Sequence, residues 1–349
     1  MATNSAQAAQ HGGSKGRAYL ILIIGIIALA FTAPWVKQSN FEPATSVILR
    51  VGLGIIFLLP FFLREIKKFG AINKKGIMLS LFAGLFLGID FTAWNYSIFY
   101  VGSGIASILL NIQIIILPAL AAIFDKEKVP KSFFIIAPIM VLGVIISGGV
   151  LEGNAPASGP STVYGMNIAV LGTIAGTISG CCYGIYLYTS RKASRVNKVD
   201  QIVQPMFYAN LAQLIAPTLF LGFSGRGFDL THGVLVNGAL PMNPETTVGD
   251  PITAMNWFWM IVLASLGQAI AWTFVQYGAV RLDPTIVAGL LLLSPISTVA
   301  IIAVVLFGEI PSPLQILGVV IVLAAVAFQN NLHKSLFKKS KGGKSTGTS

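Results

Sequence analysis

Charged residues are scarce in this sequence. Only 10% of its 349 residues are Asp, Glu, Lys or Arg, whereas 55% are apolar, and the mean hydropathy is +0.79. An average soluble domain contains about 25% charged residues, so this composition excludes most soluble enzymes as well as disordered and fibrous proteins. It is typical of a polytopic membrane protein.

Residues that build disulfide frameworks, metal sites and nucleotide sites are also few. The two cysteines, Cys181 and Cys182, are adjacent in an apolar run and cannot form a disulfide scaffold. The three histidines (His11, His232 and His333) lie outside the apolar runs, which argues against a His/Cys metal site. No G-x-x-x-x-G-K-S/T motif, the mark of an ATP-binding loop, is present. We therefore expect no cofactor and no metal.

Ten apolar segments are long enough to cross a membrane as helices, which takes about 20 mostly apolar residues. The first follows basic residues like a signal peptide, but it is long and has no A-x-A-like cleavage site after it, so we interpret it as a retained span. The predicted spans are residues 17–36, 43–63, 76–97, 103–124, 132–150, 164–190, 200–222, 254–280, 284–307 and 311–332.

The distribution of Lys and Arg predicts the orientation of these spans. With the N-terminus in the cytoplasm, twenty basic residues fall in cytoplasmic segments, and only Lys37 and Arg226 fall in outer loops. Cytoplasmic loops of membrane proteins carry such an excess. We therefore expect a multi-pass protein of the plasma membrane, in bacteria the inner (cytoplasmic) membrane, with both termini in the cytoplasm. This topology also accounts for the net charge of +11 without a nucleic-acid partner.

The two halves of the chain resemble each other. At an offset of 181 residues, Tyr96 aligns with Tyr277 and Pro130 with Pro311. Each half has five spans, an odd number, so the second half must enter the membrane from the opposite side. Such an inverted repeat is the architecture of many secondary transporters. The predicted parts are a cytoplasmic N-terminal tail (1–16), a first five-helix repeat (17–150), an outer linker (151–163), a second five-helix repeat (164–332) with a long outer loop at 223–253, and a basic cytoplasmic tail (333–349).

Short motifs recur at matching places in residues 95–147 and 275–330. The first stretch contains Tyr96-Ser97, Gly104-Ile105-Ala106-Ser107, Glu127, Pro130 and Gly143, and the second contains Tyr277-Gly278-Ala279, Pro284-Thr285-Ile286-Val287-Ala288, Pro295, Gly308-Glu309, Pro311 and Gly318. These motifs, together with an arginine in the second span, resemble the EamA-type repeats of the drug/metabolite transporter superfamily. The resemblance implies export of amino acids, related metabolites or drugs. The loop at 223–253 is longer than the family pattern.

Two ionisable residues lie well inside predicted spans. Arg50 and Asp90 are each seven residues from the outer end of their span, and so roughly 10 Å deep. An ionisable group at this depth is costly and by default marks a functional site. Three interpretations are open: a charge pair that locks the fold, snorkelling to the outer interface, or a site in which Arg50 binds a substrate carboxylate or phosphate through its bidentate fork while Asp90 is its partner or a proton carrier.

Further polar and aromatic residues lie near the same depth in both halves. Hydrogen bonding between helices is the simplest interpretation of amides in lipid, but a transporter site is also expected at the interface of the repeats. Gln113 and Ser294 should then face each other across the cavity, and Gln268 and Trp272, four residues apart, should share a helix face. The candidate cavity residues are Arg50, Asp90, Trp94, Asn111, Gln113, Ser179, Asn210, Gln268, Trp272 and Ser294.

Glycines recur at four-residue spacing in two predicted spans. Small residues at this spacing let helices approach closely. Static packing is one interpretation, and a sliding surface for alternating access is the other. The glycines are Gly84 and Gly88 in the third span and Gly172, Gly176, Gly180 and Gly184 in the sixth.

These observations favour an all-α transporter that is not an enzyme. It would move a small metabolite, such as an amino acid, across the plasma membrane by alternating access, as an exporter. A drug, organic-cation or nucleoside carrier is the alternative within the same class. A membrane-embedded enzyme would need clustered His, Asp, Glu or Cys, and a channel would need a repeated polar stripe; the sequence has neither. The expected partners are a small-molecule substrate and the lipid bilayer. Coupling to protons and the choice between monomer and homodimer stay open.

Overall fold

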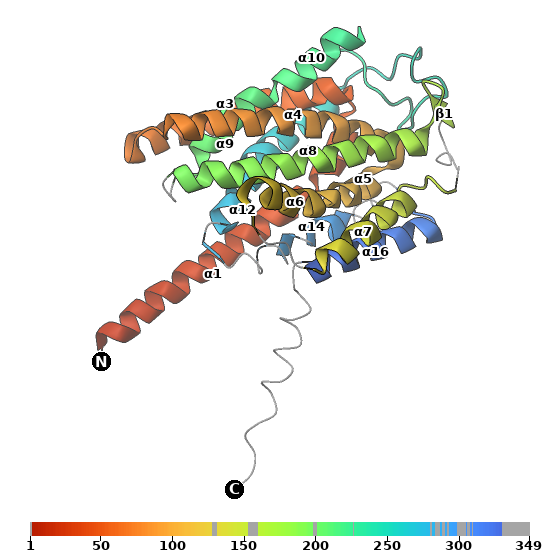
Figure 1. The fold of residues 1–349 in the computed structure, drawn as a ribbon. Coiled ribbons are helices and arrows are strands. Elements are labelled where there is room, and N and C mark those ends of the chain that lie inside the picture. Colours follow the sequence, from red (N-terminus) through yellow and green to blue (C-terminus); the bar gives the residue numbers. More distant parts are fainter. Residues whose placement is uncertain are drawn as a thin grey trace.

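The computed structural model describes residues 2–127, 131–152, 160–197, 201–225, 227–279 and 310–329, and also residues 281–282, 287, 290–291, 293–298, 305 and 308. This part of the chain is almost entirely helical (Figure 1). The helices of the first half are α1 (Ala2–Ala30), α2 (Thr32–Ser39), α3 (Pro43–Phe69), α4 (Lys74–Val101), α5 (Ser103–Leu109), the 3₁₀-helix η1 (Leu110–Ile112), α6 (Gln113–Asp125) and α7 (Phe133–Ser147).

The second half continues the same pattern after a small hairpin. The two-residue strands β1 (Thr162–Val163) and β2 (Met166–Asn167) pair antiparallel. The helices that follow are α8 (Ile168–Val196), α9 (Val203–Gln213), α10 (Ile215–Ser224), α11 (Ala254–Val262), the π-helix η2 (Leu263–Ile270), α12 (Ala271–Ala279), α14 (Leu293–Ser297) and α16 (Pro313–Gln329).

Seven helical stretches of the described chain are long and apolar enough to cross a membrane. They are Gly16–Ser39, Pro43–Phe69, Lys74–Val101, Ser103–Asp125, Ile168–Val196, Val203–Ser224 and Ala254–Gly278. Two further predicted spans appear as the shorter apolar helices α7 and α16. Most of the predicted span 284–307 and all of the tail 333–349 lie outside the described residues. The count of ten spans and the inverted repeat therefore stay predictions.

Several helix boundaries differ from the expected ones for local reasons. Residues 2–16 of the predicted tail are helical, since α1 begins at Ala2 in a run rich in alanine and glutamine, which favour helices. The helix α8 begins at Ile168 because the Asn167 side chain caps it, accepting hydrogen bonds from two backbone N–H groups of its first turn. Thr253 and Asn256 cap the start of α11 in the same way, as a capping box.

Two predicted spans are interrupted four residues before a proline. The proline ring clashes with the carbonyl of the residue four positions earlier. Accordingly, α1 ends at Ala30, four residues before Pro34, and α9 ends at Gln213, four residues before Pro217. The chain continues as α2 and α10, so each pair still forms one membrane-length stretch.

Close helix packing is organised by glycines. A Cβ added at Gly84 of α4 would lie 2.0 Å from the backbone oxygen of Ala209 in α9, and one at Gly88 would lie 2.4 Å from the backbone oxygen of Gln213. In α8, Gly172 faces the end of α4, whereas Gly180 and Gly184 face the stretch from α5 to α6, where a Cβ at Gly180 would lie 2.1 Å from Ile112. In Figure 1, α8 lies along α4 and α7 lies along α16. The glycines of α4 and α8 thus mark the faces on which these helices approach their neighbours most closely.

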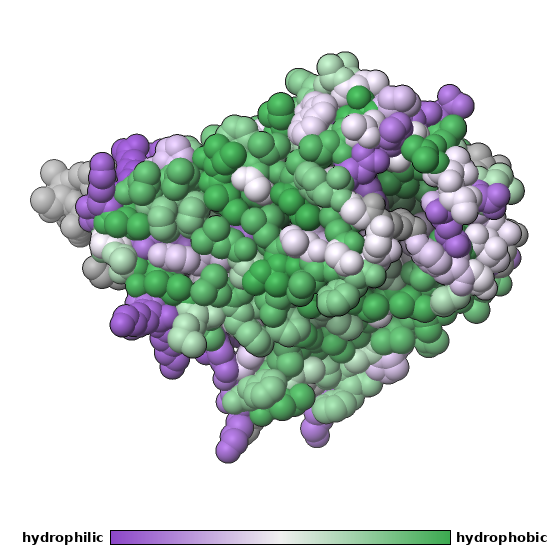
Figure 2. All heavy atoms as spheres, turned by 90° about the horizontal axis from the view of Figure 1, so that it is seen from above, coloured by the Kyte–Doolittle hydropathy of each residue, from purple (hydrophilic) through white to green (hydrophobic). Residues whose placement is uncertain are grey.

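The surface of the molecule fits a bilayer. Large apolar side chains such as Leu20, Phe61 and Phe134 are 59–72% exposed, which is unfavourable in water but expected next to lipid. Figure 2 shows a broad hydrophobic surface over the middle of the molecule, with hydrophilic residues gathered toward its ends. We call the end with Lys67 and Lys68 the basic end, and the end with residues 227–253 the loop end.

At the basic end, one carboxylate ties the two halves together. Glu65 of α3 accepts hydrogen bonds from the backbone N–H groups of Ile202, Val203 and Gln204 at the start of α9, at 2.9–3.1 Å. These N–H groups have no partner within their own helix, and the helix dipole favours a negative charge there. Glu65 lies in a charged, solvated-looking run of the sequence, so its buried capping role was not apparent from sequence.

Candidate functional site

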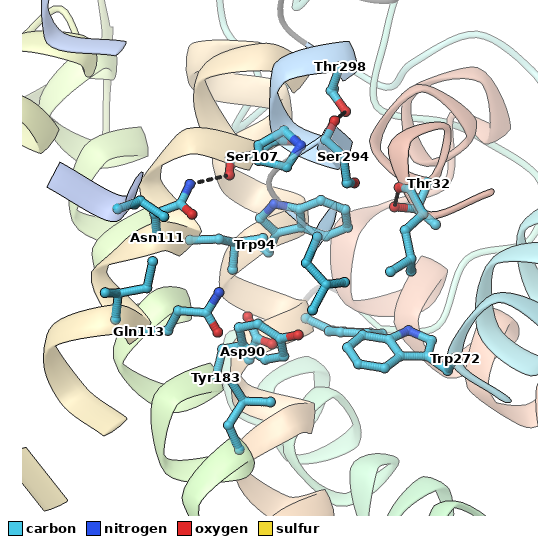
Figure 3. A pocket seen from close by; sticks show the side chains of 18 of the residues that line it. Thr32, Asp90, Trp94, Ser107, Asn111, Gln113, Tyr183, Trp272, Ser294 and Thr298 are labelled. Atoms are coloured by element: carbon cyan, nitrogen blue, oxygen red, sulfur yellow. Dashed lines mark hydrogen bonds between the residues drawn. The ribbon is translucent and has the colours of Figure 1, made fainter. Parts of the chain in front are cut away.

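A cavity of about 340 Å³ lies in the middle of the bundle. Side chains from α4, α6, α12 and α14 project toward it in Figure 3. Its volume falls within the range of small-molecule sites, and apolar walls with a few polar groups are typical of such sites. Its lining residues are Leu29, Thr32, Arg50, Asp90, Phe91, Trp94, Ser107, Leu110, Asn111, Gln113, Ile114, Leu117, Tyr183, Leu187, Trp272, Leu291, Ser294, Pro295, Thr298 and Val326.

Arg50 is the most unusual side chain of the cavity wall. It is 1% exposed, and its Nε and Nη1 atoms have no hydrogen-bond partner. Its guanidinium carbon lies 4.2 Å from the centre of the Phe91 ring, which provides some stabilisation of the cation but satisfies no donor. A buried charge without partners is strongly unfavourable, so these donors are available for an acceptor that the protein does not supply.

Asp90 lines the same cavity, and its side chain is hydrogen-bonded by a residue of α8. It is 1% exposed, and its Oδ1 accepts a hydrogen bond from the hydroxyl of Ser179 in α8. No ion pair links Asp90 to Arg50, both of which are within the described chain. In this conformation Arg50 and Asp90 therefore do not form the direct charge pair that was one of the interpretations of the sequence. The two charges face one cavity, with the guanidinium stacked on a ring and the carboxylate bonded to a hydroxyl.

Five more of the predicted residues line this cavity. Trp94, Asn111, Gln113, Trp272 and Ser294 lie on its wall. Asn111 donates to the backbone oxygen of Ile108 at 3.0 Å, whereas the Oε1 of Gln113 and the Nε1 of Trp94 are buried without partners. Trp272 contacts the ring of Tyr183 edge-on at 6.0 Å between centroids. The cavity thus has aromatic walls and several unsatisfied polar atoms.

Three of the ten predicted residues do not line the cavity. Asn210 and Gln268 do not line the cavity but form a separate buried cluster with Gln213. The Nε2 of Gln268 donates to Asn210 Oδ1 at 3.1 Å and to Gln213 Oε1 at 3.3 Å. Gln268 and Trp272, four residues apart, therefore do not both face the cavity: Trp272 lines it, whereas Gln268 is bonded within this cluster. Ser179 acts on the cavity only through Asp90.

Some wall residues were not predicted. Phe91 and Tyr183 are ordinary members of apolar helices, and nothing in the sequence distinguishes them from lipid-facing aromatics. Thr32 lies at the break between α1 and α2, where its hydroxyl donates to the backbone oxygen of Leu29 at 2.6 Å. A threonine two residues before Pro34 is the one signal that could have indicated it.

A second cavity, of about 370 Å³, lies near the loop end between α4, α8 and α10. Its walls are apolar and aromatic, with Tyr96, Tyr100 and Phe220 among them. The hydroxyl of Thr92 there donates to the backbone oxygen of Gly88, and that of Tyr96 donates to Glu42. Because these polar groups are already bonded, this cavity lacks the unsatisfied charge that distinguishes the first.

Comparisons with known proteins find a family match for part of the chain and a similar fold among solved structures. Residues 16–149 match the EamA-like transporter family. A search of curated proteins returned no match. Among solved structures 24 chains match, and one of them, described only as a crystal structure of a protein, superposes with a TM-score of 0.55 at 14% identity, covering 91% of this chain and 98% of its own. At that identity the likeness shows the fold alone.

Proposed function

We propose that the chain is a secondary transporter of the drug/metabolite transporter superfamily and that its substrate is a small metabolite bearing a carboxylate. The match of residues 16–149 to the EamA-like transporter family supports the first part of this proposal. The observation that carries the substrate class is the buried Arg50, which has two unpaired nitrogens beside a cavity of about 340 Å³. A carboxylate matches the guanidinium fork in both charge and geometry. The protein would bind and release its substrate without chemical conversion, and so would not be an enzyme.

The other residues of the cavity wall narrow the range of candidate substrates further. Asp90 is the second charge on the cavity, and a substrate ammonium group would balance it as a carboxylate balances Arg50. Trp94, Trp272 and Tyr183 offer aromatic surface to an apolar side chain. An amino acid or a related zwitterion satisfies all three features. An organic cation is the second candidate, since Asp90 and aromatic rings suit it, but it would leave Arg50 unpaired. The proposed direction of transport is export: substrate binds from the basic end and is released at the loop end by alternating access.

A flux assay tests this proposal directly. Purified protein in proteoliposomes should transport at least one amino acid with an apolar or aromatic side chain, with saturation and with competition among carboxylate-bearing analogues. The panel should also contain nucleosides and organic cations. Transport of cations without any transport of carboxylates would contradict the assignment to Arg50. Protein-free liposomes and an Arg50→Gln variant are the controls for leakage.

The proposed topology places the basic end in the cytoplasm and the loop end outside, with ten spans in two inverted repeats. The support is the excess of Lys and Arg at one end. In a variant with Cys181→Ser and Cys182→Ser, a cysteine at Thr246 should react with a membrane-impermeant maleimide added to intact cells. Thr246 is exposed in the 227–253 segment. A cysteine at Ser335, which lies outside the described residues, should react only after the cells are permeabilised. Labelling of Ser335→Cys in intact cells would overturn the topology.

A further inference from the structure

The segment of residues 227–253, which connects α10 to α11, is folded on itself. The backbone N–H of Gly233 donates to the carbonyl of Asp250, and the N–H of Asp250 donates to the carbonyl of Leu235, each at 2.9 Å. A Cβ at Gly249 would lie 2.2 Å from the carbonyl oxygen of Gly233, so only glycine fits there. The segment is therefore a compactly folded loop. The sequence shows only that it is longer than the family pattern and indicates no role for it.

Asn40, in the turn between α2 and α3, binds this segment. Its side-chain oxygen accepts hydrogen bonds from the N–H groups of Val234 at 3.2 Å and Leu235 at 2.8 Å, and its backbone oxygen accepts one from Val234 at 3.0 Å. Asn40 has a φ of 56°, a left-handed conformation that asparagine adopts more readily than most residues. A Cβ at Gly233 would lie 2.2 Å from Asn40 Nδ2, so the 227–253 segment and the α2–α3 turn are in direct contact.

Two further contacts join the segment and its flanks to other turns at the loop end. The backbone N–H of Tyr164, in the hairpin before α8, donates to the carboxylate of Glu245. Just beyond the segment, the Nδ2 of Asn256 donates to the backbone oxygen of Gln38 at 2.9 Å. The segment is covalently part of the second half of the chain, whereas Gln38 and Asn40 belong to the first half. These bonds therefore hold the two halves together at the loop end.

An apolar cluster lies beneath the segment. Leu235 and Leu240 of the segment are buried in it, and so is Trp94, which also lines the substrate cavity. No residue of the 227–253 segment lines the cavity, so the cluster separates the two. The other buried members of this cluster are Ala33, Val36, Phe41, Ile98, Phe99, Tyr100, Ala106, Val163, Ile168, Met260 and Leu263.

We propose that residues 227–253 form a lid that closes the outer exit of the cavity, and that Asn40 is the latch of this lid. The inference rests on the proposed transporter function and topology. The three hydrogen bonds of Asn40 form only while the α2–α3 turn lies against the lid, so they favour the closed conformation over any conformation open to the outside. Release of substrate to the outside requires these bonds to break and Leu235 and Leu240 to leave the cluster.

Accessibility of the cavity from outside tests the latch without knowledge of the substrate. In the Cys181→Ser/Cys182→Ser background, a reporter cysteine at Ser107 lies on the cavity wall. Asn40→Ala should raise its rate of reaction with an impermeant maleimide added to intact cells by about tenfold, because the two hydrogen bonds that the Asn40 side-chain oxygen accepts in the closed state are lost. Asn243→Ala, which removes an exposed amide of the same lid, is the matched control and should leave the rate unchanged.

Several outcomes would overturn the lid. Equal labelling rates for Asn40→Ala and the parent, both monodisperse in size-exclusion chromatography, would show that Asn40 does not latch an exit. A rise seen only in inside-out vesicles would place the lid on the other side. Neither result depends on flux, so a failure of the substrate assignment leaves this test intact.

A reversible cross-link provides the second test, independent of any folding defect of Asn40→Ala. Glu245 of the lid and Tyr164 of the hairpin before α8 are in contact and both exposed, so the cysteines of a Glu245→Cys/Tyr164→Cys variant can be joined by a disulfide or a short methanethiosulfonate cross-linker. Once a substrate is known, oxidation should lower flux at least about tenfold, and a reductant should restore it. Complete cross-linking with unchanged flux would mean that the segment is a static cover, contrary to the proposal.

Discussion

Replacing Arg50 by glutamine should abolish substrate flux while leaving the protein folded. Its Nε and Nη1 are buried and unpaired beside the cavity, so a substrate carboxylate would gain two charge-assisted hydrogen bonds there. Each such bond contributes about 1.5–3 kcal/mol, and losing both should reduce substrate affinity by a factor of about 100 or more. Binding by the purified protein, together with flux in proteoliposomes, measures the effect.

Two variants separate the role of the fork from the role of the charge. Arg50→Lys keeps the cation but cannot make the bidentate contact, so it should bind substrate more weakly than the parent and more tightly than Arg50→Gln. Arg64→Gln, at an exposed position of the same helix, should transport normally. Unchanged substrate affinity in Arg50→Gln would exclude Arg50 from the site.

In thermal unfolding, Arg50→Gln should be less stable than Arg50→Gln combined with Asp90→Asn, because the single change leaves a buried carboxylate without any balancing charge.

The sequence was informative wherever lipid imposes a strict requirement. A spanning helix needs a long apolar run because its backbone must be hydrogen-bonded internally, and this requirement located the seven membrane-length stretches of the described chain. The high cost of a charge inside the membrane likewise singled out Arg50 and Asp90, both of which line the cavity.

The sequence was uninformative where contacts are non-local. Gln268 was assigned to the cavity because it is a polar residue near mid-membrane depth, but its amide donates to Asn210 in a separate cluster. Glu65 lies in a run of basic residues, and only the packing of α3 against α9 shows that it caps a helix. The 227–253 segment has no helical or strand periodicity, and its attachment to Asn40 joins residues about 195 positions apart in the chain. Neither period nor composition encodes such a contact.

The substitution Gly84→Ala should have the largest effect on folding. The added Cβ would lie 2.0 Å from the backbone oxygen of Ala209 and 2.7 Å from its carbonyl carbon. Backbone atoms of a helix cannot rotate away as a side chain can, so α4 and α9 would have to separate along their contact. Overpacking of this kind costs about 3 kcal/mol or more. The yield of monodisperse protein and its apparent melting temperature should both fall sharply.

Two companion variants identify the cause of this loss. Gly52→Ala makes the same change in α3 where nothing lies within 4 Å of the new Cβ, and it should stabilise the protein by about 0.5–1 kcal/mol through helix propensity. Ala209→Gly should fail to rescue Gly84→Ala, because the clash is with the backbone of residue 209 and not with its side chain. Rescue would instead indicate that side-chain packing limits the approach of the helices.

Since α4 also carries Asp90 and Trp94, the glycine contact that fixes α4 on α9 also fixes the position of these two residues on the cavity wall. A residual folded population of Gly84→Ala should therefore bind substrate more weakly than Gly52→Ala.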